Sequence, residues 1–124
     1  MSQPEYLQDC FILKRSTAAC DEGPEVLMRP GMIAVRYDTE SIDGRDWTTI
    51  TFMGAVALRV VPEFAVEAML IGAYSKISIV INSKWVGTMI GAEGGLVSDL
   101  KHFVVFFDHY GSVEVIARTH EVQE

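Results

Sequence analysis

The sequence predicts an α+β fold, mainly antiparallel β-sheet with hairpins, packed against one or two short helices. Three features predict it: a turn signal at Asp43-Gly44 between alternating segments, a second turn at His109-Tyr110-Gly111 between apolar segments, and a single stretch, Pro62 to Tyr74, that favours a helix. The chain has 124 residues. Because domains commonly run to about 100 to 150 residues, we expect one globular domain over 1–124.

The first hairpin is predicted around Asp43-Gly44, a dipeptide suited to a two-residue turn in which both positions need positive φ. Pairing outward from that turn gives two faces. Ile42 faces Arg45 next to the turn. Further along, one face carries Tyr37 opposite Ile50, Val35 opposite Phe52 and Ile33 beside Gly54, and the other carries Arg36 with Thr51 and Asp38 with Thr49. The face with Tyr37 is apolar, so we expect it to be buried.

The second hairpin is predicted between Leu100 to Asp108 and Ser112 to Val122, with Gly111 in the left-handed conformation. Asp108 then closes the loop against Ser112. The same register sets Phe107 by Val113, Val105 by Val115, Phe103 by Ala117 and His102 by Arg118. Both faces are largely apolar, which is typical of strands in the middle of a sheet that is covered on each side.

Other segments fill in the fold. Pro62 to Tyr74 is a candidate cover for the second hairpin, with Pro62 and Glu63 at a favourable helix start, although its valines also fit a strand. The N-terminal segment is the other candidate cover. Lys76 to Asn82 predicts a strand with its isoleucines on one side. Asp21 to Gly31 predicts a loop because its prolines and glycines interrupt periodic structure.

The net charge limits the possible partners, and the cysteines indicate the cellular compartment. The formal net charge is -7, and residues 47–107 are neutral, so the negative charge belongs to the two ends of the chain. This balance argues against nucleic acid and anionic membranes as partners, because both attract Lys and Arg. No segment predicts a signal peptide, a membrane span, a disulfide or a zinc ligand pair, so we expect a cytoplasmic protein with reduced thiols.

Four acidic residues, Asp38, Glu40, Asp43 and Asp46, gather around the first turn. They do not form a calcium-binding EF-hand loop, since the places that need Gly and Glu hold Asp43 and Thr49. We interpret them as a solvated hairpin tip that could contact a basic partner. Trp85 and Tyr110 are the aromatic residues predicted to be exposed, and these could anchor such a contact.

A second candidate surface carries His102, Glu114, Arg118 and His120, which the predicted register places on one face. Two histidines are too few for a zinc site, so no metal is predicted, but the face could bind a small molecule or serve an enzyme. No catalytic residue or cofactor is predicted. Ser112, Asp108 and His109 crowd a turn without a pocket. Gly91, Gly94 and Gly95 match no phosphate-binding spacing.

One resemblance bears on function. Ile77 to Val86 with Asn82-Ser83-Lys84-Trp85, then Leu100-Lys101-His102-Phe103, and the run Phe107 to Ala117 resemble small bacterial immunity proteins of toxin systems. The resemblance is confined to this C-terminal segment and to structural motifs. It implies a non-enzymatic protein that binds and blocks a cognate toxin. We therefore expect an immunity-type binding protein with an acidic docking surface; the alternatives are a small-molecule-binding protein or enzyme, and a homo-oligomer suggested by the 49% hydrophobic content.

Overall fold

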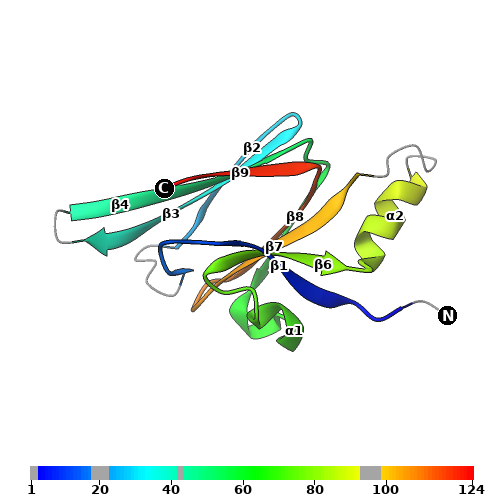
Figure 1. The fold of residues 1–124 in the computed structure, drawn as a ribbon, viewed down its shortest axis with the longest axis horizontal. Coiled ribbons are helices and arrows are strands. Elements are labelled where there is room, and N and C mark those ends of the chain that lie inside the picture. The colour runs from blue at the N-terminus through cyan, green and yellow to red at the C-terminus, as the bar shows by residue number, and fades with distance from the viewer. Residues whose placement is uncertain (1–2, 18–22, 42–43, 93–98) are drawn as a thin grey trace.

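The computed structural model describes residues 3–17, 23–41, 44–92 and 99–124. It confirms the α+β class, because these residues form two antiparallel sheets with short helical segments (Figure 1). The larger sheet has the strand order β1 (Tyr6–Ile12), β6 (Lys76–Ile81), β7 (Lys101–Phe107), β8 (Gly111–Ala117) and β5 (Ala57–Pro62). The smaller sheet has the order β2 (Glu25–Arg29), β3 (Met32–Ser41), β4 (Gly44–Met53) and β9 (Thr119–Gln123).

The main hydrophobic core lies between the two sheets. Tyr37 of β3 packs edge-on against Phe107 of β7 with ring centroids 5.3 Å apart, and Phe52 of β4 lies 5.2 Å from Phe103. A smaller cluster covers the opposite face of the larger sheet. There Val104 and Phe106 of β7 pack beneath the helical segment that follows β5. The prediction that the second hairpin is covered on both faces is confirmed.

The first hairpin has the predicted faces but a different register. Tyr37 pairs with Thr48 and Val35 with Ile50, which is a shift of two residues from the prediction. Because side chains alternate with a period of two, this shift leaves every residue on its predicted face. The last described pair is Ser41 with Gly44, so Gly44 ends the ladder, and residues 42–43 lie outside the described residues.

The second hairpin also differs by two residues. Phe107 pairs with Gly111, so Gly111 lies in the ladder and His109 takes the loop position with φ 72°. Gly111 still has a positive φ of 131°, which favours glycine as predicted. A neighbour in space adds a second reason for glycine at 111. A Cβ atom there would lie 1.9 Å from the backbone carbonyl oxygen of Val61, so only glycine lets β5 approach this closely.

The stretch Pro62 to Tyr74 is helical in only two short pieces. Pro62 ends β5, and the chain then forms the 3₁₀ turn η2 (Glu63–Ala65) and the helix α1 (Ala68–Ile71). These pieces cover the outer face of the larger sheet. The N-terminal segment was wrongly predicted as a cover, because β1 instead pairs with β6 at the sheet edge.

Three further segments bear on the predictions. The strand predicted at Lys76 to Asn82 is confirmed as β6, whereas the loop predicted at Asp21 to Gly31 contains β2. The helix α2 (Lys84–Ala92) was not predicted, and Gly91 belongs to it, while Gly94 and Gly95 lie outside the described residues. No helix in the described ranges is both long and apolar enough to cross a membrane.

Candidate functional site

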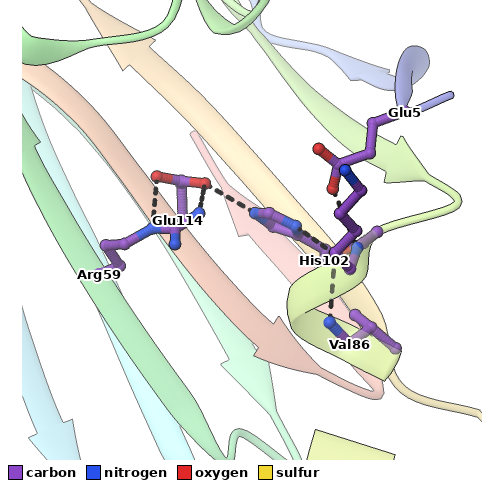
Figure 2. Close-up of polar contacts among 7 residues, drawn as sticks. Glu5, Arg59, Val86, His102 and Glu114 are labelled. Carbon is purple, nitrogen blue, oxygen red and sulfur yellow. Dashed lines mark hydrogen bonds and ion pairs between the residues drawn. The ribbon is translucent and has the colours of Figure 1, made fainter. Parts of the chain in front are cut away.

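Glu114 of β8 lies on the outer face of the larger sheet and is only 1% exposed. Antiparallel pairing sets Arg59 of β5 directly opposite it. Figure 2 shows the resulting two-pronged contact, in which Arg59 Nε donates to Glu114 Oε2 at 3.0 Å and Nη2 donates to Oε1 at 2.8 Å. Such bidentate pairs fix both orientation and charge, so Glu114 is a firmly held anion.

His102 of β7 extends the network from Glu114 to the start of α2. Its Nε2 lies 2.8 Å from Glu114 Oε1, and its Nδ1 lies 2.7 Å from Ser83 Oγ (Figure 2). Because a carboxylate can only accept, His102 Nε2–H is the donor to Glu114. Ser83 Oγ also accepts the Val86 N–H at 3.2 Å, which is the cap expected at a helix N-terminus. The network therefore ties α2 to the sheet.

The pKa values follow from these contacts. Burial by itself would raise the pKa of Glu114, but hydrogen bonds from His102 and Arg59 together outweigh burial and lower that pKa. The hydrogen bond to Glu114 is the main reason that the pKa of Arg59 is raised. Both shifts favour the charged forms, so this ion pair persists through neutral pH.

The Trp85 ring packs against two members of this network, His102 and Arg59. Its ring meets the His102 ring edge-on, with centroids 5.1 Å apart, and the Arg59 guanidinium carbon lies 4.4 Å from the Trp85 ring centroid. Trp85 is half-buried. It was predicted as an exposed partner contact, but the structure places its ring half-buried against His102 and Arg59.

A pocket of about 220 Å³ opens between this network and the helical segment above it. Glu5, Arg59, Glu67, His102 and Glu114 supply its charged and ionisable lining, and Ser112 adds a hydroxyl. The apolar lining comes from β5, β6 and the η2–α1 segment, and includes Val61, Val66, Met69, Leu70 and Val80. The pocket thus combines a few polar groups with apolar walls, which is typical of small-ligand sites.

Ser83, His102 and Glu114 are also the residue types of a nucleophile, its base and an orienting carboxylate. The neighbouring backbone donors are engaged, however. The Val86 N–H binds Ser83, and the Lys84 N–H donates to Glu5 Oε2 at 2.9 Å, so neither is free to stabilise a developing oxyanion. Glu114 is committed to Arg59. The arrangement favours a structural role for Ser83.

The predicted face of His102, Glu114, Arg118 and His120 is wrong as a unit. His102 and Glu114 are together, but Arg118 pairs with Asp99 at 3.1 Å. His120 lies in β9 of the smaller sheet, against the Phe103 ring at 5.4 Å, which is on the other face of β7 from His102. The reason is that the chain leaves the larger sheet at Arg118, so the hairpin register does not extend to His120.

The acidic residues predicted at the first hairpin's tip also differ from the prediction in their exposure and pairing. Asp38 is 1% exposed and ion-paired with Arg45, so its prediction as a surface contact is wrong. Asp46 pairs with Arg15 at 3.2 Å. Glu40 is exposed, and Asp43 lies outside the described residues. Tyr110 is exposed, as predicted.

The sequence reasoning missed five site residues: Arg59, Ser83 as a helix cap, and Glu5, Glu67 and Ser112 as lining of the pocket. A serine just before a run of helix-compatible residues is a cap signal, so Ser83 could have been found. Arg59 carries no local signal, because its role depends on β5 pairing with β8.

Neither a metal-binding cluster nor a similarity to known proteins helps to assign this site. Within the described ranges, no group of three or more His, Cys, Asp or Glu side chains is placed to hold a metal ion. Comparison of the chain with protein-family models, with curated proteins and with solved structures finds no match.

Proposed function

We propose that this protein is a non-enzymatic binding protein that associates with a basic protein through the segment 63–74, which spans η2 and α1. The observation that carries the proposal is Phe64, which is 92% exposed and lies between the exposed Glu63 and Glu67. Ile71 and Tyr74 on the same segment are also exposed. Exposed aromatic residues within a polar surround are typical anchors of protein interfaces.

Charge supports this segment over the hairpin tip. Among the described residues, six basic side chains lie within ion-pairing distance of a carboxylate: Arg15, Arg36, Arg45, Arg59, Lys76 and Arg118. At the tip, these pairs neutralise Asp38 and Asp46. Glu63 and Glu67 have no ion pair among the described residues, and Glu63 Oε2 accepts only the His109 N–H there. Their charge is therefore available to attract a basic surface.

The resemblance to immunity proteins suggests a more specific proposal: the basic partner is a toxin, and this protein blocks it by binding. An inhibitor of this kind needs affinity and a fast encounter, and a negative surface speeds the encounter with a positive partner. Catalytic groups are not needed for it.

The test is co-expression of the chain with each product of its neighbouring genes, followed by calorimetric titration of any basic product that co-purifies. We expect Phe64→Ser and Glu67→Lys each to weaken binding at least tenfold, and binding to weaken as salt rises. Glu40→Lys is the matched control, because it makes the same charge change on the hairpin strand β3 and should leave the affinity within about twofold.

Three results would contradict the proposal: equal losses in Glu67→Lys and Glu40→Lys, a captured protein that is acidic, or binding that does not depend on salt. Protection of growth from the co-purified protein, lost in Phe64→Ser, would assign the immunity-type form. Sedimentation of the chain alone at high concentration tests the homo-oligomer alternative.

A second candidate function, small-molecule binding, is favoured by the pocket over Glu114 and by its unpaired Ser112 hydroxyl. This hydroxyl points to a particular ligand chemistry.

A further inference from the structure

Ser112 Oγ is fully buried, lines the pocket and has no hydrogen-bond partner among the described residues. Burying a hydroxyl without a partner is unfavourable, so such groups are rare in folded proteins. Two other hydroxyls, those of Thr48 and Ser78, are buried and unpaired, but neither lines this pocket. Ser112 is thus the unpaired hydroxyl that a ligand in the pocket could satisfy.

The charges around the pocket favour a cation. Its lining holds three carboxylates, those of Glu5, Glu67 and Glu114, against the one guanidinium of Arg59. Both prongs of Arg59 are held by Glu114, and Glu114 in turn accepts from His102. Among the described residues, Glu5 accepts only the Lys84 N–H, and Glu67 is exposed. Both carboxylates act on Arg59 by charge alone and help to raise its pKa, while the Arg59 guanidinium is bound by Glu114, so Glu5 and Glu67 can balance a further positive group.

The remaining walls suit a short apolar stem. Val61 lies opposite Ser112 across the β5–β8 pair, and Leu70 and Val80 also line the pocket. The volume of about 220 Å³ is several times that of a water molecule, about 30 Å³, and falls below the range of drug-sized pockets. The ligand is therefore small.

We propose that this pocket binds a primary ammonium group on a short alkyl stem, with Ser112 Oγ accepting one N–H and the carboxylates of Glu5 and Glu67 balancing the charge. The same chemistry is offered by a free alkylamine and by a lysine side chain. A lysine would come from the basic partner, and only that form rests on the function proposed above.

The test is a heteronuclear NMR titration of the full chain with n-butylamine, n-butanol and N-acetyl-lysine methylamide at pH 7. We expect n-butylamine to bind with millimolar affinity and to shift the backbone signals of β5, β8 and α1. The n-butanol control has the same stem without the charge, and it should bind at least tenfold more weakly.

Two serine variants separate a ligand contact from a structural effect. Ser112→Ala and Ser78→Ala each remove one buried, unpaired hydroxyl, so both should keep or raise the melting temperature. Only Ser112→Ala should weaken n-butylamine binding, by about tenfold, as expected for one hydrogen bond to a charged group. Glu67→Gln should weaken it about threefold, because that carboxylate is exposed.

The inference is overturned if neither amine binds, if n-butanol binds as well as n-butylamine, or if Ser78→Ala loses as much affinity as Ser112→Ala. Binding of n-butylamine without the blocked lysine assigns a free amine. Binding of both, with the blocked lysine at least as tight, assigns a lysine side chain. Because these titrations use no protein partner, their failure is separate from failure of the protein contact at Phe64.

Discussion

Replacing Glu114 by Gln tests the polar network most directly, because the substitution keeps the shape of the side chain and removes its charge. Glu114 accepts two hydrogen bonds from Arg59 and one from His102. A glutamine amide can accept through its oxygen, but its NH₂ group must face one of these donors. The variant leaves Arg59 without its counterion.

The size of the effect follows from burial. Removing one partner of a buried ion pair costs about 3 to 5 kcal/mol, but the Arg59 side chain is 47% exposed and can be rehydrated. We therefore expect a loss of about 2 to 3 kcal/mol in the free energy of unfolding. With an unfolding entropy of about 2 cal/mol/K per residue, this corresponds to a fall of about 8 to 12 °C in the melting temperature.

Urea denaturation of the wild type and the variant measures this loss, with Asp46→Asn as the control. Asp46 forms a partly exposed ion pair with Arg15, so its neutralisation should cost less than about 1 kcal/mol. If Glu114→Gln cost no more than this control, the ion pair would not hold the two strands and the reasoning would fail.

The pH dependence supplies a second check. The pKa of Glu114 is lower in the folded chain than its ordinary value of 4.5, so the unfolded chain binds the proton more readily. The stabilisation is therefore present above pH 4.5 and is lost as the pH falls through the lowered pKa. The stability gap between wild type and Glu114→Gln should shrink over that acidic range, and a constant gap from pH 7 to pH 3 would refute the assignment.

Three further predictions concern the fold. Gly111→Ala should destabilise the chain by more than about 3 kcal/mol, because the added Cβ would overlap a β5 carbonyl. Gly31→Ala has open space around the added Cβ and should cost only about 1 to 2 kcal/mol, from its left-handed φ. Similar unfolding midpoints for the two variants would contradict this. Tyr37→Phe should cost about 1 kcal/mol in urea denaturation, since its buried hydroxyl donates to a backbone carbonyl at 2.8 Å. Burial and the nearby Lys101 lower the pKa of His120, so NMR titration should find it below 6.5, and the neutral ring's contribution to stability should be lost as the pH falls. A pKa at or above 6.5 would count against the burial of that ring.

The sequence predicted which face of each hairpin is buried better than it predicted which residues pair across the strands. In both hairpins the burial pattern was right and the pairing was displaced by two residues. Alternation fixes which face a residue occupies, whereas register depends on the turn, and each turn began one position earlier than predicted. At 111 the glycine signal was real, because the residue has the expected positive φ, and the close approach of β5 adds a second requirement for glycine that no local pattern reveals.

The candidate site was harder to predict because it is assembled from distant segments. Arg59 meets Glu114 through strand pairing between residues 55 apart, and Ser83 meets His102 across 19 residues. His102 and Glu114 were expected together because both lie in one hairpin. The predicted position of His120 was wrong because it assumed one continuous strand, whereas the chain passes from the larger to the smaller sheet at Arg118.

The same assembly changes what the net charge of -7 means for function. The sequence places acidic residues at the hairpin tip, but the fold brings arginines to Asp38 and Asp46 there, whereas Glu63 and Glu67 form no ion pair within the part of the chain that the structure describes. Ion pairs within the protein reduce the field at the tip, so the attraction for a basic group is strongest where carboxylates outnumber cations. Glu67 lines the pocket and lies three residues after the exposed Phe64, so the protein contact and the ammonium site are proposed on the same segment of the chain.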